Sequence, residues 1–384
     1  MRSIRGAVVL LLSLSLALPA TPALAQTSAP EPSLNRDPDR ARLVTSDLPN
    51  FWRALDQSAA GDSAARVAAL ETIYLRPGSP GLHAWVRSRL VDQNAVIARL
   101  DTNVWPMARV VAVMRTPDGG PELAALEAAA APYLDHNAAE ELGKTVSLLP
   151  DFYQAIRRNA LALDASPEIT DSIRARFRRF KVMYPEAVFP DVYFLVGRLT
   201  SGGTTAPAGL LLGVEVNERA GRLPNGHPAA STASTADRAA RYAGIVTHEL
   251  MHYQQHGTGG RTLLDQTLVE GTADFVAGVV AGAPAPCGTG DRNTWGLAHE
   301  AALWSEFSAA AGGERMGDWL YNGGQSGDRP ADLGYFMGCR IAESYYAKAT
   351  DKTAALRRIL TRDDAAGLLK ESGYASRFGP AAAR

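Results

Sequence analysis

The chain contains the segment Val-Thr-His-Glu-Leu-Met-His, in which a glutamate follows the first of two histidines four residues apart. Side chains four apart lie on one face of an α-helix, so His248 and His252 can direct ring nitrogens at one metal ion. Glu249 points beside that face, where its carboxylate can take a proton from a water molecule that the metal polarises. The pattern predicts a zinc site for hydrolysis with Glu249 as general base. The alternative is a chance match, in which two histidines on the helix surface lie beside an exposed glutamate.

A third protein ligand would separate these interpretations, because catalytic zinc takes three protein ligands and keeps one position open. Glu270, eighteen residues after His252, is the best candidate. The glycine-rich segment 256–261 can reverse the chain and bring the next helix back over the first. Asp274 lies one turn further on the same face, and we expect it to accept the other ring N–H of a liganding histidine.

Other third ligands fit less well. His256 continues the four-residue spacing, but it lies about 12 Å of helix rise from the first histidine, too far to share an ion with bonds of about 2 Å. A metzincin site needs a glycine three residues and a histidine six residues after His252, where this chain has Gln255 and Thr258. Asp274 could itself bind the metal, so that alternative stays open.

The first half of the chain is predicted to be helical. Amphipathic stretches alternate there with breaks rich in proline and glycine. The expected helices are residues 51–60, 64–75, 82–100, 122–134, 138–162 and 168–183.

The second half is predicted to combine a small sheet with more helices. β-Branched, aromatic and aliphatic residues fill 188–199 and 210–216, which predicts two strands joined by a hairpin loop over 200–209. The second strand would suit an edge position above the metal-site helix, where a peptide could pair with it, but a plain hairpin that caps helices fits equally. The expected helices here are residues 237–256, 264–281, 294–311, 333–349 and 353–360. The predicted fold class is therefore α+β and predominantly helical.

These motifs together resemble a known family. HExxH followed by Glu-x-x-x-Asp is the gluzincin arrangement. The wider set of motifs resembles the predicted Zn-dependent protease family related to gliding-motility lipoproteins. The segments that carry this resemblance are Val246–His252, Val269–Phe275 and Gly334–Gly338. The resemblance spans roughly residues 188–349. It implies a zincin-like metallopeptidase domain that hydrolyses peptide bonds, with Zn²⁺ on the two histidines and Glu270.

Peptide hydrolysis also needs a donor for the negative charge that develops on the carbonyl oxygen. Tyr335 and Arg340 are the first candidates, because the family pattern brings their segment near the metal. His299 and Tyr345 come next. Ordinary packing or a surface charge fits each of the four as well.

The N-terminus resembles a secretory signal. Arg2 and Arg5 precede the apolar run 7–18, and the small-residue sequence 23–25 follows two prolines. We expect a signal peptide at 1–25, a flexible leader at 26–38, a helical region at 39–186 and the zincin-like domain at 187–384. The mature protein would be exported, and thus periplasmic or secreted.

Export changes the meaning of the two cysteines. Cys287 and Cys339 would tend to pair in an oxidising compartment, with two buried free thiols as the alternative.

The 39 basic residues balance 40 acidic ones without a basic stripe, which argues against a nucleic-acid partner. No apolar run after the signal is long enough to span a bilayer.

The sequence therefore predicts an exported zinc metallopeptidase whose partner is a peptide or protein substrate. A non-catalytic envelope protein for binding or assembly on a zincin-like fold is one alternative, and a zinc amidase acting on cell-wall peptide is another. Glu249 favours an enzyme, because a scaffold has no need of a carboxylate beside two histidines.

Overall fold

The computed structural model divides into two compact units. The described residues are 34–115, 120–163, 165–257, 259–288, 290–323 and 329–379. Unit 1 comprises Ala41–Asp171 and Pro190–Tyr242, and unit 2 comprises residues 34–40, Ser172–Phe189 and residues 243–379. The expected boundary after residue 186 thus falls inside a stretch of unit 2.

The expected signal peptide and most of the leader lie outside the described residues. The end of that leader, however, has specific partners. The side-chain amide of Asn35 donates to the backbone carbonyl of Phe189 at 2.9 Å. The backbone carbonyl of Asn35 accepts from the backbone amide of Phe189 at 2.7 Å.

Unit 1 is mostly helical. Its helices are α2 (Leu48–Gln57), α3 (Ser63–Ala69), α4 (Pro80–Trp85), α5 (Gln93–Ile97), α6 (Met107–Arg115), α7 (Gly120–Leu148), α8 (Pro150–Leu161) and α10 (Val214–Asn217), with π-helical segments η1 (Leu70–Leu75) and η2 (Val86–Leu90). The predicted break after residue 134 is wrong, because α7 continues through it with Pro132 inside. His136 and Asn137, poor helix formers, find partners there: His136 Nδ1 lies 2.8 Å from Glu71 Oε2, and Asn137 accepts from the amide of Asp92.

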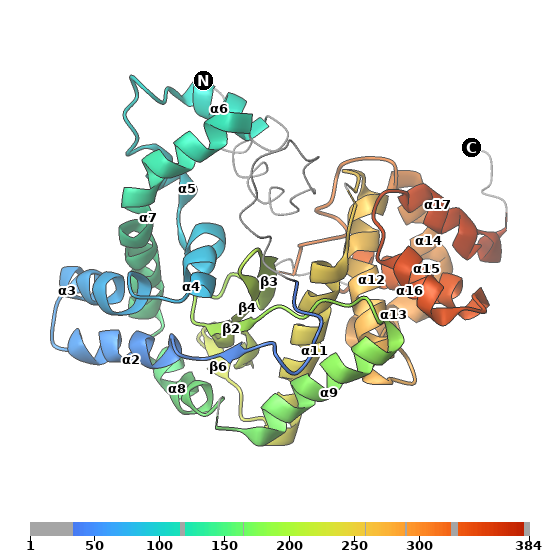
Figure 1. Cartoon of the computed structure of the whole chain (residues 1–384), viewed down its shortest axis with the longest axis horizontal. Helices are drawn as coiled ribbons and strands as arrows, with labels where there is room; N and C mark the ends of the chain where they lie inside the picture. Colours follow the sequence, from blue (N-terminus) through green and yellow to red (C-terminus); the bar gives the residue numbers. More distant parts are fainter. Residues whose placement is uncertain are drawn as a thin grey trace. The chain divides into compact units, whose positions relative to one another are not determined.

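The main sheet of unit 1 has the order β1-β2-β4-β3, with β1 at Leu43–Val44, β2 at Val192–Leu195, β3 at Gly203–Ala206 and β4 at Gly209–Gly213 (Figure 1). The predicted hairpin is wrong, because the two predicted strands, β2 and β4, pair parallel to each other. The hairpin partner of β4 is β3, which lies in the expected loop. An edge position for β4 is also wrong, since β3 is the edge. The polar Gly-Thr-Thr-Ala sequence of β3 has no apolar pattern, whereas β2 and β4 are buried along their length.

A second, two-stranded sheet in unit 1 pairs β5 (Arg219–Arg222) with β6 (Pro228–Ala230). Between this sheet and β4 lies α10, which carries a fully buried carboxyl group at Glu215. Its Oε1 accepts from the amide of Leu199 at 3.1 Å, and its Oε2 has no hydrogen-bond partner. Burial raises the pKa of Glu215 to about 7, despite backbone hydrogen bonds that lower it.

Unit 2 is helical. Its helices are the larger part of α9 (Pro167–Met183), the second part of α11 (Thr235–Gln254), α12 (Leu263–Ala281), α13 (Asp291–Ala298), α14 (Glu300–Ala310), α15 (Leu333–Lys348), α16 (Lys352–Ile359), α17 (Ala365–Ser372) and the 3₁₀ turn η4 (Ala375–Phe378). The single helix predicted over 294–311 is two helices that meet at His299.

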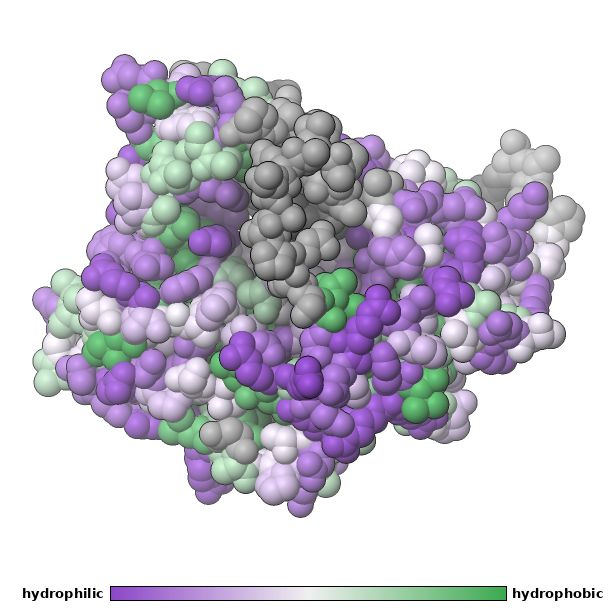
Figure 2. Space-filling view, in the orientation of Figure 1, coloured by the Kyte–Doolittle hydropathy of each residue, from purple (hydrophilic) through white to green (hydrophobic). Residues whose placement is uncertain are grey.

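Helix α9 shows how the apolar pattern sets its orientation. Ile169, Ile173, Phe177 and Phe180 are buried and recur at helical spacing. Figure 2 shows hydrophilic residues over this helix, in keeping with the arginines that fill its other faces. The helix therefore buries one stripe and leaves a charged surface.

Helices α12 and α15 pack closely (Figure 1). A Cβ atom at Gly271 would collide with the backbone of Gly338 and Cys339, so the two backbones can approach only because glycine lacks a side chain. The disulfide Cys287–Cys339, with Cα atoms 5.7 Å apart, ties the segment after α12 to α15 and confirms the predicted pairing. Among the described residues, none of the helices combines the length and the apolar character that crossing a membrane requires.

Candidate metal centre

The candidate centre lies in unit 2 between α11 and α12. The chain leaves α11 after Gln254 and reverses over a turn in which Gly257 and Gly259 adopt positive φ angles of 94° and 59°. Thr262 then begins α12 with a capping box, in which its hydroxyl accepts from the amide of Asp265 and its own amide donates to the Asp265 carboxylate. The glycine-containing turn and the capping box therefore place α12 against the HExxH face of α11.

This arrangement brings three donor atoms together. His248 Nε2 and His252 Nε2 are 3.0 Å apart, and Glu270 Oε2 lies 3.6 Å and 3.2 Å from them. Tetrahedral zinc with bonds of about 2.0–2.1 Å holds neighbouring ligand atoms about 3.3 Å apart. The spacing of two nitrogens and one oxygen is therefore close to that of three ligands on one zinc ion.

Asp274 lies where it orients the first of these ligands. Its Oδ1 is 2.8 Å from His248 Nδ1, and its Oδ2 accepts from Arg292 Nη2 at 2.6 Å. Because an ionised carboxylate only accepts hydrogen bonds, His248 keeps its proton on Nδ1 and turns Nε2 toward Glu270. Burial raises the pKa of Asp274, but the bond with His248 and the charge of Arg292 lower it overall.

The charges around the triad favour a cation at its centre. Burial lowers the pKa of His248, but the bonds with Asp274 and Glu270 and the charge of Glu249 outweigh it and raise the pKa well above its usual value. Burial raises the pKa of Glu270, yet the charge of His252 and the bonds with both imidazoles take it well below its usual value. A site that holds positive charge on the imidazoles beside an ionised carboxylate can exchange those protons for a divalent ion.

Glu249 is buried, with 5% of its surface exposed. Its negative charge raises the pKa of both His248 and His252, against the opposing effect of their burial. The clustered donor atoms come from His248, His252 and Glu270, and Glu249 is not among them. A buried carboxylate whose charge acts on both imidazoles is a candidate general base.

Tyr335 lies beside the cluster. Its ring stacks on that of His248 with centroids 6.3 Å apart and an angle of 24° between the planes. The guanidinium of Arg292 covers the Tyr335 ring, 4.9 Å from its centroid. Burial and the nearby charge of Glu270 raise the pKa of Tyr335, so its phenol stays protonated as a hydrogen-bond donor.

A second tyrosine, Tyr321, was not predicted. Its hydroxyl donates to Glu270 Oε1 at 2.8 Å, although 62% of the residue is exposed. Tyr321 has a φ of 59°, in the left-handed region that is uncommon for residues other than glycine. Reciprocal hydrogen bonds of 3.0 and 2.6 Å between Asn322 and Asp332 close the loop behind it. No local sequence pattern connects this loop to α12.

Arg340, expected as an oxyanion donor, has other partners. Its guanidinium donates to Glu300 at 2.7 Å and also to Glu343, and Glu300 accepts further from the hydroxyl of Tyr374. This ion-pair cluster holds α14, α15 and the C-terminal segment together. The structure therefore does not bring Arg340 to the metal ligands, because its side chain leaves α15 on a different side from Tyr335. His299, a further candidate, stacks on Trp295.

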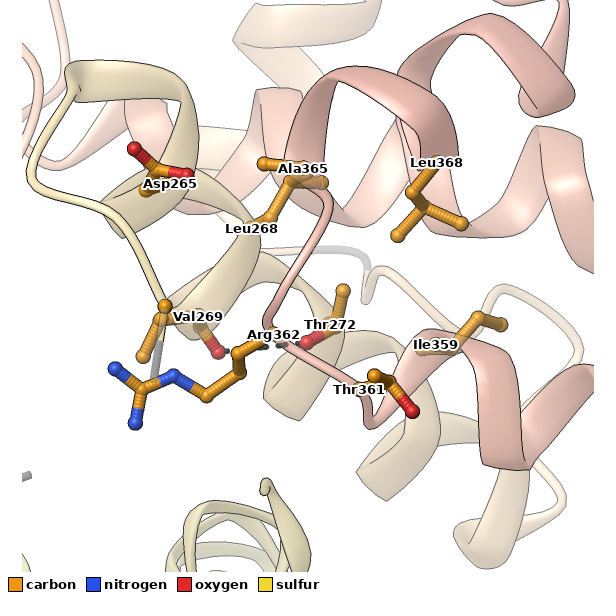
Figure 3. Close-up of a pocket in the computed structure, with 10 residues that line it drawn as sticks. Asp265, Leu268, Val269, Thr272, Ile359, Thr361, Arg362, Ala365 and Leu368 are labelled. Carbon is orange, nitrogen blue, oxygen red and sulfur yellow. Dashed lines mark hydrogen bonds between the residues drawn. The ribbon is translucent and has the colours of Figure 1, made fainter. Parts of the chain in front are cut away.

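A small pocket lies on another side of α12, against the segment that follows α16 (Figure 3). Leu268, Val269 and Thr272 of α12 line it together with Thr361 and Arg362. Its volume of about 20 Å³ holds about one water molecule, so it is too small for a peptide.

Comparison with family models, curated proteins and solved structures returned no match to this chain. The zincin-like fold and the family suggested by the motifs therefore stay predictions, and the donor geometry carries the functional argument.

Proposed function

We propose that the chain is an exported zinc metallopeptidase in which His248, His252 and Glu270 hold the metal. The observation that carries this proposal is the convergence of two imidazole nitrogens and one carboxylate oxygen at tetrahedral spacing, with Glu249 buried beside them. A chance pair of surface histidines would not have a buried carboxylate at each of these places.

Zinc bound there would supply a Lewis acid that polarises a carbonyl oxygen and acidifies water. Glu249 takes the proton from the attacking water and returns it to the leaving amine. Asp274 and Arg292 fix the ring of His248, so that its Nε2 faces the metal position. The phenol of Tyr321, which donates to Glu270 Oε1 at 2.8 Å, and the phenol of Tyr335, whose ring lies against that of His248, would stabilise negative charge on the substrate oxygen.

Peptides as substrates and export as destination have separate support. The resemblance of the HExxH and Glu-Gly-x-Ala-Asp motifs to predicted Zn-dependent proteases supports a peptide substrate. The disulfide Cys287–Cys339 supports folding in an oxidising compartment such as the periplasm.

Metal analysis and a digestion assay test the proposal together. We expect the purified protein to hold one zinc ion per chain and to cleave casein or members of a peptide library. Glu249→Gln should keep zinc and lose hydrolysis, whereas His252→Ala should lose both. Full turnover in the Glu249→Gln variant would refute the mechanism. Zinc with no hydrolysis of any peptide would favour a binding or assembly role, and cleavage of peptidoglycan alone would favour the amidase.

A further inference from the structure

The second histidine ligand has a partner of its own that the proposed mechanism does not use. Gln255 lies three residues after His252, directly after the end of α11. Its Oε1 is 3.0 Å from His252 Nδ1. Its Nε2 donates to the carbonyl of Val269 at 2.6 Å and to the hydroxyl of Thr272 at 3.0 Å. Figure 3 shows Val269 and Thr272 on the same side of α12.

These contacts leave the amide only one orientation. The carbonyl of Val269 can only accept a hydrogen bond, so the NH₂ group of Gln255 must face α12. The amide oxygen of Gln255 then faces His252, and because that oxygen also can only accept, His252 must carry a proton on Nδ1. The lone pair that remains available for a metal is on Nε2, the atom 3.0 Å from His248 Nε2.

We propose that Gln255 is the positioning residue for His252, and that α12 sets the tautomer of this metal ligand through the Gln255 amide. The inference rests on the proposed zinc site. The two histidines are thus held differently: His248 by a carboxylate whose charge Arg292 balances, and His252 by a neutral amide. Both arrangements present Nε2 to the metal position.

The neighbouring Gln254 provides a matched control. It is the same residue type one position earlier, at the last residue of α11, and it is buried with 8% exposed. Its Oε1 accepts from the amide of Val188 at 2.9 Å and its Nε2 donates to the carbonyl of Val188 at 2.8 Å. These bonds tie α11 to the segment after α9 and involve no metal ligand.

The test compares zinc affinity in the full chain with Gln255→Ala and Gln254→Ala, by competition with a colorimetric zinc chelator. We expect Gln255→Ala to weaken zinc binding 10–100-fold, the usual effect of losing an outer partner of a ligand, and Gln254→Ala to stay within about twofold of the unaltered protein. Urea unfolding of both metal-free variants shows whether each change merely destabilises the helix. Replacement of zinc by Co²⁺ should give a shifted visible spectrum in Gln255→Ala alone.

A second readout is the tautomer itself. Long-range ¹H–¹⁵N spectra of the zinc-loaded protein should show His252 protonated at Nδ1. Unchanged zinc affinity in Gln255→Ala, equal losses in the two glutamine variants, or a proton on Nε2 would each overturn this inference alone. Failure of the unaltered chain to bind zinc would instead overturn the proposed function on which the inference rests.

Discussion

The buried carboxyl group of Glu215 predicts an unusual pH dependence for the stability of unit 1. Its pKa of about 7 in the folded protein lies above the ordinary value of 4.5. The folded state therefore holds its proton more tightly than the unfolded chain does. The stabilisation is fully present below about pH 4.5 and is lost as the pH rises through about 7. With about 1.4 kcal/mol for each pKa unit, the loss amounts to about 3 kcal/mol.

Few other groups near Glu215 titrate in the pH range of this measurement. The titratable side chains whose pKa values respond to its charge are the buried phenols of Tyr74, Tyr153 and Tyr242, and burial raises the pKa of each well above its usual value. They stay neutral across the relevant range. Histidine does not contribute to the shift of Glu215, whose causes are burial and three backbone hydrogen bonds.

The assay is urea unfolding of unaltered protein and Glu215→Gln, followed from pH 4.5 to 8.5. Glutamine keeps the size of the side chain and an oxygen for the amide of Leu199, but does not ionise. We expect the free energy of unfolding of the unaltered protein to fall relative to the variant by about 3 kcal/mol between pH 4.5 and 7.5 and to level off above that range. A difference that is constant with pH, or that grows in the opposite direction, would refute the assignment.

Three further predictions concern unit 2. Tyr321→Phe should lower the rate of peptide cleavage at saturating zinc about 10²-fold, as measured by initial rates, because one oxyanion donor is lost; an unchanged rate would exclude that role. Asp274→Asn should weaken zinc binding 10–100-fold in chelator competition, since the amide can offer an N–H to His248 in place of an acceptor; equal affinity would contradict the positioning argument. Gly271→Ala should cost about 1–3 kcal/mol in urea unfolding, because the added methyl group meets the backbone of α15; a neutral effect would mean that the two helices are not in such close contact.

The juxtaposition of the three donor residues was predictable from the sequence because its geometry is local. The spacing of His248 and His252 within one helix sets their common face, and a glycine-rich turn followed by a capped helix places Glu270 opposite. Two helices and one turn therefore specify the whole donor set. The predominantly helical character of the fold and the disulfide were predicted for similar reasons of pattern and composition.

The surroundings of the ligands depend on tertiary contacts that no local pattern records. Arg292 reaches Asp274 from α13, and Tyr321 reaches Glu270 from a loop fifty-one residues further along the chain. Arg340 pairs with Glu300, and a position on α15 does not by itself tell which neighbours a side chain meets. The predicted hairpin of β2 and β4 was wrong because a third strand, β3, lies between them along the chain. β3 is short and polar, so it has no apolar pattern by which the sequence could predict it.

The central claim is that two imidazoles and one carboxylate hold zinc. Anomalous diffraction at the zinc edge, from crystals of the protein purified with its metal, tests it directly. The account predicts one zinc ion with bonds of about 2.0–2.2 Å to His248 Nε2, His252 Nε2 and a Glu270 oxygen, and one position left for water. Zinc bound elsewhere on the chain, or coordinated without Glu270, would contradict it.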